Sequence, residues 1–380
     1  MLFRSMKKRF LGVLLSVAMV AAVLAGCGSS GAKETAAPAG SETEAASEAA
    51  SGETEAASGE TEAAGNTGDV ITVGFSQVGA ESDWRTANSE SMKSTFSTEN
   101  GYNLIFDDAQ QKQENQIAAI RNFIQQEVDY IVLAPVTESG WDTVLQEAKD
   151  AEIPVIIVDR MVDVSDDSLY TAWVGSNFKL EGQKACEWLK QYAAAKNMSE
   201  VNIVDIQGTI GASAQIGRTE ALNEAVEANG WNLLAQQTGE FTQAKGQEVM
   251  ESMLKQYDNI NVVYCENDNE AFGAIEAIKA AGKTVGPDGD ILVMSFDTTK
   301  QGITDTLSGD IIVNTECNPL HGPRVEQIIK QLQAGETPEK QAYVEEGIYA
   351  HGSDVASVSI DGTDYEVTEV TQDVVDARAY

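Results

Sequence analysis

The 380-residue sequence contains few basic residues and few histidines, and each scarcity excludes a class of function. Its 25 Lys and Arg residues accompany 60 Asp and Glu residues, giving a formal net charge of −35. Nucleic acids and anionic membrane surfaces require a positive footprint, so neither is expected as a partner. The two histidines, His321 and His351, belong to no zinc motif, and the chain has no phosphate loop or nucleophile elbow. We therefore expect no catalytic residues, no bound metal and no cofactor.

Cysteines are also few, and only one has an informative position. Cys186, Cys265 and Cys317 are scattered without the close spacing of a metal site, and an odd number gives no disulfide framework. We expect these three to be small core residues. Cys27, in contrast, follows directly after an apolar run that extends from Phe10 to Leu24.

That run belongs to a segment with the pattern of an export signal. Four basic residues precede it between positions 4 and 9, and it is too short for a membrane-spanning helix. Its end, Leu24-Ala25-Gly26-Cys27, resembles a bacterial lipobox, which implies cleavage of residues 1–26 and a diacylglycerol group on the Cys27 sulfur. Two acyl chains form a stable anchor where one does not. The alternative is an ordinary cleaved signal beside a chance cysteine.

Residues 27–69 are predicted to be an acidic, disordered tether on that lipid anchor. From position 28 to 69 there is no aromatic residue and no Val, Ile, Leu or Met, and nine acidic residues accompany one Lys. Such a segment cannot bury enough apolar surface to fold, and its like charges extend it. A short helix is the alternative for the three Glu-Thr-Glu-Ala-Ala repeats, but the Gly and Ser residues between them oppose it.

Residues 70–380 are numerous enough for two domains, and they alternate strand and helix patterns. The first half has predicted strands at 70–75, 102–106, 130–134 and 153–158, with helices at 82–98, 115–126 and 140–150. The pattern restarts with strands at 201–206, 231–235, 260–264 and 291–296, and with helices at 212–229, 243–257 and 269–281. Apolar strands separated by helices indicate parallel sheets covered on both faces. We therefore predict an α/β fold with two doubly wound lobes.

Polar residues collect where the predicted strands end. They are Ser76, Gln77, Asp159, Arg160, Gln207, Gly208, Glu266, Asn267, Asp268 and Asp297. Ligands of doubly wound sheets bind beyond the carboxyl ends of the strands, and two such sheets that face each other form a cleft. These residues are therefore candidates for a small-ligand site between two lobes.

Stretches of this sequence also resemble a known family. They are 73–79, Glu81–Arg85, 110–116, 134–136, Gly140-Trp141, 147–154, Asp159-Arg160, 207–209, 211–213 with Arg218, 239–241, 245–251, 267–268 and Asp297. In these stretches, spread over most of residues 70–335, the chain is similar to type I periplasmic sugar-binding proteins of the ribose- and galactose-binding kind. Within that family it most resembles the galactofuranose-binding members. It departs from the pattern in a longer tail after Gly347 and in Glu316, where ribose-type relatives carry Gln.

The resemblance implies a monomeric receptor with two lobes joined by a multi-strand hinge. The N-terminal lobe is expected to contain residues 70–173 plus about 317–342, and the C-terminal lobe residues 174–316 plus about 343–380. A monosaccharide, galactofuranose or a related furanose, hexose or pentose, would bind in the cleft and favour closure of the lobes. ABC permease subunits in the membrane would then accept the sugar. The protein would be extracytoplasmic and held to the outer face of the cytoplasmic membrane.

A sugar offers hydroxyl groups around weakly apolar C–H faces, so charged planar groups and aromatic rings suit it. We expect Trp84 and Phe241 to cover the C–H faces. The expected hydroxyl ligands are Arg85, Arg160 and Arg218 as donors, Asp159, Asp297 and Glu316 as acceptors, and Asn267 as both, with added contacts from Ser76, Gln77 and Glu81. The alternatives are core packing for the aromatic residues, surface ion pairs for the arginines, and helix capping for Asp159 and Asp297.

Three other functions share parts of this pattern. A glycosidase also needs two carboxylates beside a sugar. A transcription regulator of the lactose-repressor type has the same two lobes, but it would begin with a basic helix-turn-helix, where this chain has an apolar signal and an acidic tether. A sugar sensor that docks on a membrane receptor or kinase is the remaining alternative to import.

Overall fold

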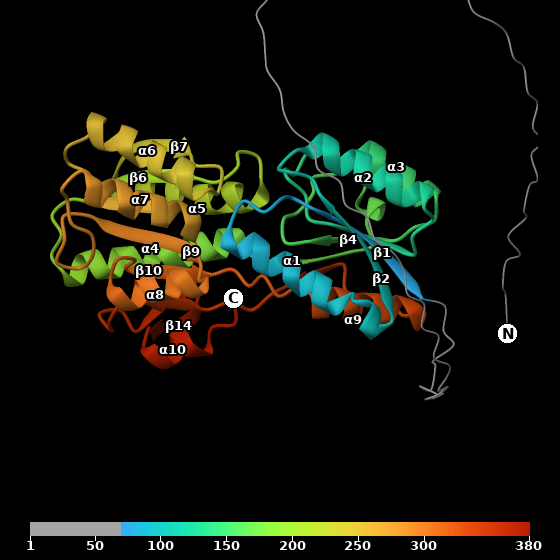
Figure 1. Ribbon diagram of the computed structural model, residues 1–380. Helices are drawn as coiled ribbons and strands as arrows, with labels where there is room; N and C mark the ends of the chain where they lie inside the picture. The colour runs from blue at the N-terminus through green and yellow to red at the C-terminus, as the bar shows by residue number, and fades with distance from the viewer. Residues whose placement is uncertain (1–69) are drawn as a thin grey trace, which may run out of the picture. The chain divides into compact units, whose positions relative to one another are not determined.

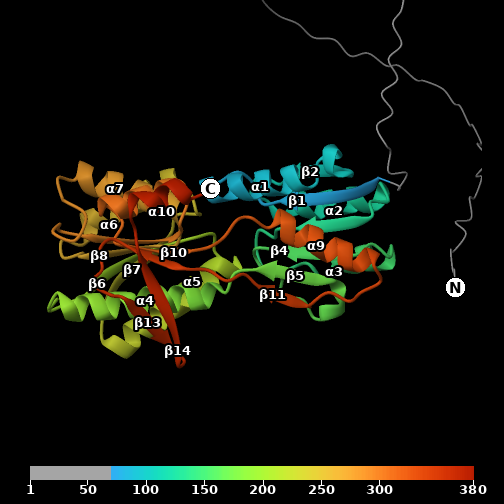
Figure 2. The ribbon, with the colours of Figure 1, turned by 90° about the horizontal axis from the view of Figure 1, so that it is seen from below.

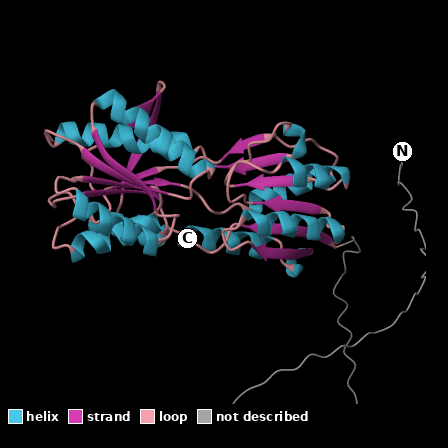
Figure 3. Cartoon of the chain, turned by 90° about the horizontal axis from the view of Figure 1, so that it is seen from above, coloured by secondary structure: helices cyan, strands magenta, loops and turns pink. Residues whose placement is uncertain are grey.

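The computed structural model describes residues 70–380, which lie within one compact unit, Asn66–Tyr380. The predicted export signal, Cys27 and the acidic tether lie outside the described residues. The described chain forms two lobes, and each is a sheet with helices on both faces (Figure 1, Figure 3). The prediction of an α/β fold with two doubly wound lobes is confirmed. No helix within residues 70–380 has the length and apolar character needed to cross a bilayer.

The N-terminal lobe contains a six-stranded parallel sheet in the order β11-β5-β4-β3-β1-β2. Its strands are β1 (Ile71–Gln77), β2 (Tyr102–Asp108), β3 (Tyr130–Leu133), β4 (Val155–Val158), β5 (Ala172–Gly175) and β11 (Gln341–Tyr343). Its helices are α1 (Asp83–Thr95), α2 (Gln113–Gln125), α3 (Asp142–Asp150) and α9 (Gly322–Gln333), with 3-10 turns at Thr98–Asn100 and Asp167–Leu169.

The C-terminal lobe contains an eight-stranded sheet in the order β13-β14-β12-β10-β9-β8-β6-β7. Its strands are β6 (Asn202–Gln207), β7 (Asn232–Thr238), β8 (Val262–Cys265), β9 (Leu292–Asp297), β10 (Val313–Glu316), β12 (Ile348–Ala350), β13 (Ser357–Ile360) and β14 (Thr363–Glu369). Its helices are α4 (Phe178–Ala195), α5 (Ser213–Asn229), α6 (Gln243–Gln256), α7 (Asp268–Ala280), α8 (Lys300–Ser308) and α10 (Gln372–Ala377). Strands β6 to β10 are parallel, whereas β12 is antiparallel to β10. The long tail after Gly347 supplies β12, the β13–β14 hairpin and α10, and so extends this sheet at one edge.

Each sheet is buried on both faces, which explains why its strands are continuously apolar. In β4, Ile156 and Val158 pack in one core cluster, whereas Val155 and Ile157 pack in the cluster on the opposite face. The C-terminal lobe likewise has one large cluster on each face of its sheet. The polar side chains that follow these strands therefore gather at the strand ends, where the two lobes meet.

Short polar signals determine where the helices that face the other lobe begin. Helix α1 begins after Ser82, whose Oγ accepts a hydrogen bond from the Arg85 N–H at 3.1 Å. Helix α7 begins after Asn267, whose Oδ1 accepts from the Glu270 N–H at 2.8 Å. Such caps satisfy backbone donors that have no partner within the helix.

The chain crosses between the lobes three times. The first crossover, 175–178, joins β5 to α4; the second, 316–322, joins β10 to α9; and the third, 343–348, joins β11 to β12. All three run through the middle of the molecule, between the two sheets (Figure 2). Hydrogen bonds connect them, as the Ser176 Oγ and the Asn318 N–H both donate to Glu346. They form the connection about which the lobes are arranged.

Candidate functional site

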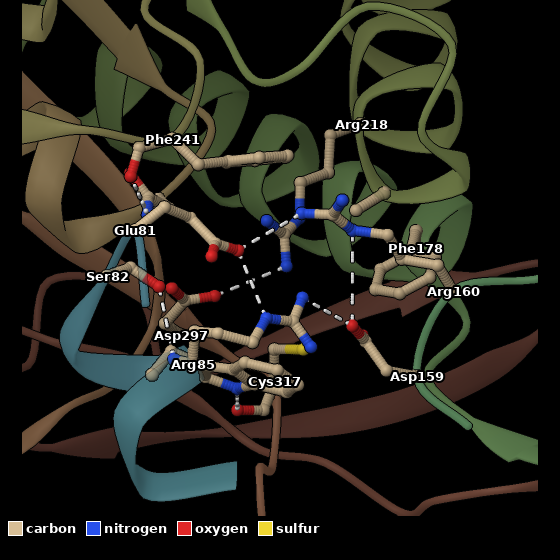
Figure 4. Close-up of a pocket in the computed structure, with 13 residues that line it drawn as sticks. Glu81, Ser82, Arg85, Asp159, Arg160, Phe178, Arg218, Phe241, Asp297 and Cys317 are labelled. Carbon is tan, nitrogen blue, oxygen red and sulfur yellow. Dashed lines mark hydrogen bonds and ion pairs between the residues drawn. The ribbon is translucent and has the colours of Figure 1, made fainter. Parts of the chain in front are cut away.

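A small cavity lies between the carboxyl ends of the two sheets. Its lining comes from both lobes and from the second crossover (Figure 4). The residues that line it are Glu81, Ser82, Trp84, Arg85, Asp159, Arg160, Phe178, Ala214, Arg218, Phe241, Asn267, Asp297 and Cys317. This is the position at which doubly wound sheets bind ligands.

The structure brings nine of the residues proposed from the sequence to this cavity and leaves three outside its lining. Those at the cavity are Glu81, Trp84, Arg85, Asp159, Arg160, Arg218, Phe241, Asn267 and Asp297. Gln77 lies behind Arg85 and accepts a hydrogen bond from its Nη1 at 3.2 Å. Ser76 is fully buried, and its Oγ has no hydrogen-bond partner within residues 70–380.

Glu316 occupies a different position, on the far side of the second crossover. Its Oε1 accepts from Arg378 Nη1 and from the Tyr380 hydroxyl, each at 2.8 Å, and its Oε2 accepts from the Gly347 N–H at 2.8 Å. These contacts are possible because the end of the chain returns to the region between the lobes (Figure 1, Figure 2). Glu316 therefore fixes the C-terminal residues to the start of the second crossover in this structure.

Four lining residues were not recognised from the sequence. Ser82 lies within the family-like segment Glu81–Arg85, and Ala214 directly follows the family-like segment 211–213, so both had a local signal. Phe178 follows the short strand β5, which the strand patterns did not reveal. Cys317 is buried, as expected of a small core residue, but it also contacts the cavity through the second crossover.

In the N-terminal lobe, the side chain of Arg85 is held on three sides. Its Nη2 is 2.7 Å from Asp159 Oδ2, its Nε is 3.0 Å from Glu81 Oε1, and its Nη1 donates to Gln77. Burial alone would lower the pKa of Arg85, but the charges of Asp159 and Glu81 outweigh it and raise the pKa. Burial likewise opposes ionisation of Asp159, and the charges of Arg85 and Arg160 still lower the pKa of that carboxyl group. Both groups are therefore charged at neutral pH.

Arg160 is less completely paired than Arg85. Its Nη1 donates to the Val136 carbonyl oxygen at 3.0 Å, while its nearest carboxylate contacts are 3.6 Å to Glu81 and 4.0 Å to Asp159. Burial, followed by the charge of Arg85, lowers the pKa of Arg160 to about 10. Guanidinium N–H groups without close partners remain available to a ligand.

In the C-terminal lobe, Arg218 is the central charged residue. Its Nε and Nη2 bind Glu181 Oε2 at 2.9 and 2.8 Å, and its Nη1 donates to the Glu266 carbonyl oxygen. Its Nη2 also lies 3.5 Å from Asp297 Oδ1. Burial raises the pKa of Asp297 well above its usual range, although Arg218 opposes the shift. A carboxyl group in this state gains from any further hydrogen-bond donor that a ligand supplies.

Trp84 and Phe241 place an aromatic ring on the cavity from each lobe. Both side chains are 4% exposed, and they share one apolar cluster with Phe178 and Cys317. The Trp84 Nε1–H donates to the Cys317 carbonyl oxygen at 2.6 Å, which fixes the indole against the second crossover. The Phe241 ring lies against Gly208, where an added Cβ would be 1.9 Å from the ring. Only glycine at position 208 permits that ring position.

Three lining residues have unusual backbone conformations. Asp159, Phe241 and Asp297 have φ values of 62°, 60° and 99°, in a region that residues other than glycine rarely adopt. Each follows or ends a strand, and the left-handed conformation turns its side chain out of the strand direction. Strained backbone of this kind is concentrated at binding and catalytic sites, where the surrounding structure maintains it.

The lining contains as many guanidinium groups as carboxyl groups. Three guanidinium groups, those of Arg85, Arg160 and Arg218, accompany three carboxyl groups, those of Glu81, Asp159 and Asp297. Their charged ends point toward one another in Figure 4. Such a lining favours a neutral ligand over a phosphate or an ammonium group. Donors, acceptors and aromatic faces in one small cavity suit a neutral ring that carries several hydroxyl groups.

The lobes contact each other directly around the cavity. The Asp83 N–H donates to Asn269 Oδ1 at 3.0 Å, and the Met161 N–H donates to Ser213 Oγ at 2.9 Å. The Glu138 N–H donates to the Gly211 carbonyl oxygen at 2.9 Å. Each bond joins one lobe to the other, so the lobes are in contact beside the cavity.

Comparisons with known proteins agree with this architecture. Residues 73–315 match the family model of the periplasmic binding protein domain. The galactofuranose-binding protein YtfQ of Escherichia coli (strain K12) is 42% identical over 284 residues, which cover 73% of this chain and 87% of that protein.

Two solved structures are similar over nearly the same span. A Mycobacterium smegmatis protein in complex with β-D-fucofuranose is 44% identical, has a TM-score of 0.71, and aligns over 74% of this chain and 91% of its own. The periplasmic binding protein component of the arabinose ABC transporter from Shewanella sp. ANA-3, bound to α- and β-L-arabinofuranose, is 42% identical, with a TM-score of 0.69 and coverages of 74% and 92%. The chain therefore belongs to the periplasmic binding protein domain family, and its fold is that of the type I members.

Proposed function

We propose that this chain is the extracytoplasmic, lipid-anchored receptor of an ABC importer and that it binds one monosaccharide in the cavity between its lobes. The observation that carries the proposal is the lining of that cavity, in which three arginines and three carboxyl groups balance beside two aromatic rings. The lining offers paired donors and acceptors for adjacent hydroxyl groups and apolar faces for C–H groups.

The sugar is a furanose, with galactofuranose as the first candidate. One of the three similar proteins described above is a galactofuranose-binding protein. The structures of the other two contain fucofuranose and arabinofuranose, respectively. Closure itself is part of the proposal: a sugar that bonds to both lobes favours the arrangement in which they meet, by the difference in its affinity for the open and closed states.

The lipid anchor on Cys27 and the acidic tether would hold the receptor at the outer face of the membrane, where permease subunits accept the sugar. Mass spectrometry of the membrane-extracted protein tests this part, because a diacylated N-terminal Cys27 is expected. A mature protein that begins elsewhere, or that carries no lipid, contradicts it.

A thermal-shift panel with the full chain in detergent tests the sugar assignment. The methyl furanosides of galactose, arabinose and fucose are each compared with the matching methyl pyranoside, because the ring of a free sugar interconverts in water. A bound sugar at about 100 times its dissociation constant stabilises the folded state by about 2.7 kcal/mol, which is a shift of several degrees. No shift with any pentose or hexose contradicts the proposal. Recovery of the sugar as a hydrolysed or altered product would favour a glycosidase instead.

A further inference from the structure

All three crossovers meet at one carboxyl group behind the cavity. Glu346 lies in the third crossover, and its Oε1 accepts from the Ser176 Oγ of the first crossover at 2.6 Å. The same oxygen accepts from the Asn318 N–H of the second crossover at 2.7 Å. The Lys184 ammonium group of α4 donates to the Glu346 carbonyl oxygen at 2.8 Å. One residue therefore ties the three connecting segments to each other and to the C-terminal lobe.

A second carboxyl group, that of Glu181 in α4, faces Glu346. Glu181 is 1% exposed, and its Oε2 is bound by Arg218. Its Oε1 receives no hydrogen bond from the donors of residues 70–380, and a carboxyl oxygen of Glu346 lies within 4.8 Å of a carboxyl oxygen of Glu181. Two buried carboxylates this close repel each other, which favours a proton on one of them.

The surroundings show which of the two groups holds the proton. Arg218 pairs with Glu181 and favours its charged form, whereas no cation among the described residues forms an ion pair with the Glu346 carboxyl group. Burial, and then the charge of Glu181, raise the pKa of Glu346 well above its usual range. Burial also raises the pKa of Glu181, although Arg218 opposes it. The other titratable or charged groups around the pair are Lys184 in α4, Glu316 and Asp297 at the ends of β10 and β9, and Cys317 in the second crossover.

A cation is a poor alternative to the proton in this cluster. Glu181, Cys317 and Glu346 offer ligand atoms within 4.8 Å of one another. However, Arg218 already occupies one oxygen of Glu181, and two donors occupy one oxygen of Glu346. The Arg218 and Lys184 charges would repel a metal ion at this position.

We propose that Glu346 is a positioning residue that carries a proton shared with Glu181. This proton holds the three crossovers in one arrangement, and that arrangement directs Arg218 to the cavity. The path runs from Arg218 to Glu181, to Glu346, and on to Ser176 and Asn318. Loss of the proton at higher pH drives the two carboxylates apart and loosens the crossovers. Because the proton is held in the arranged state, that arrangement is complete at low pH and is lost as the pH rises through the titration of the pair.

Substitution of Glu346 by Gln tests this inference in the full chain. Glutamine keeps the acceptor oxygen for Ser176 and Asn318, and its NH₂ group donates to Glu181 at every pH. We expect the dissociation constant of the wild-type protein for its sugar to rise about tenfold between about pH 6 and about pH 9, whereas that of E346Q stays nearly constant. Glu345→Gln is the matched control, since Glu345 is the exposed neighbour in the same crossover and its substitution should leave the wild-type pH profile unchanged.

A second measurement does not require a sugar. It therefore tests this inference independently of the proposed function, on which the affinity measurement depends. Spin labels at Gln125→Cys in α2 and Ala244→Cys in α6, both exposed positions, report the distance between the lobes. The native cysteines of the described chain are buried. We expect the distance distribution to broaden at high pH in the wild type and not in E346Q. A wild-type distribution that is constant from about pH 6 to about pH 9, or an equal pH response in both proteins, contradicts the inference. If sugar binding is absent but the distance distribution still responds to pH as expected, the proposed function is contradicted and this inference is not.

Discussion

At the scale of single residues, protein partners fix two of the three arginines that line the cavity. Arg85 and Arg218 are fixed by close carboxylate partners at 2.7 to 3.0 Å, so they lose little side-chain freedom on binding. Arg160 differs, because its carboxylate contacts are 3.6 and 4.0 Å. Its guanidinium group has the greatest remaining capacity to donate to a hydroxylated ligand.

The first prediction concerns Arg160→Ala, which should weaken sugar binding at least about 100-fold, because two charge-assisted hydrogen bonds to the ligand are lost. Calorimetric titration measures the change, and the melting temperature verifies that the variant is folded. Arg121→Ala is the matched control, because Arg121 forms an exposed ion pair with Glu147 in the same lobe. This variant should bind sugar as the wild type does. Wild-type affinity in folded Arg160→Ala would remove Arg160 from the binding site.

The second prediction concerns a buried acid that does not line the cavity. Asp205 in β6 is fully buried, and burial raises its pKa from 3.8 to about 7, although a hydrogen bond from Gln236 opposes the shift. Because the folded-state pKa is raised, the stabilisation is complete below the unfolded pKa and is lost as the pH rises through about 7. Asp205→Asn, which cannot ionise, should therefore exceed the wild type in stability at pH 8 by on the order of 2 kcal/mol, with a smaller difference at pH 5.

Denaturant unfolding at the two pH values measures that difference. The exposed substitution Asp150→Asn in α3 is the control, and its effect should depend little on pH. An Asp205→Asn protein that is destabilised equally at both pH values would show that the carboxylate is charged and satisfied in the folded state.

At the scale of elements, the loops after β6 and β7 position one wall of the cavity together. Gly208 follows β6, and the Phe241 ring of the next loop lies directly on it. Neither loop can change its backbone at this contact without displacing the other.

The third prediction is that Gly208→Ala displaces the Phe241 ring and weakens sugar binding at least about tenfold, at a cost to stability of about 1 to 3 kcal/mol. In a double-mutant cycle, Phe241→Ala should cost less stability in the Gly208→Ala background than in the wild type, because loss of the ring also relieves the clash that Gly208→Ala creates. Additive stability effects would mean that the two residues are not in contact in solution.

The elements also show what sequence patterns can and cannot predict. Strand β4 and the residues that follow it, Asp159 and Arg160, were predictable, because a short run of buried Val and Ile residues and its polar end are local signals. Cys317 and Phe178 had no such signal, because they approach the cavity through crossovers whose path depends on contacts over more than a hundred residues. Glu316 ends a strand as Asp297 does, but the returning C-terminal residues Arg378 and Tyr380 occupy its carboxylate.

At the scale of the whole molecule, two sheets face each other across a cavity that neither lobe forms alone. Hydrogen bonds between the lobes close its rim, and three crossovers joined at Glu346 lie behind it. A ligand that bonds to Arg160 in one lobe and Arg218 in the other adds to the contacts that favour this arrangement. Capture of the ligand and the relative position of the lobes are therefore expected to be coupled.

The most direct test of the account is isothermal titration calorimetry of the full chain with galactofuranose, arabinofuranose and fucofuranose. The account predicts one site per chain, with a dissociation constant of about 1 µM or tighter for at least one furanose and weaker binding of the matching pyranose. No binding of any of these sugars, in either ring form, would contradict the claim that the cavity between the lobes is a monosaccharide site.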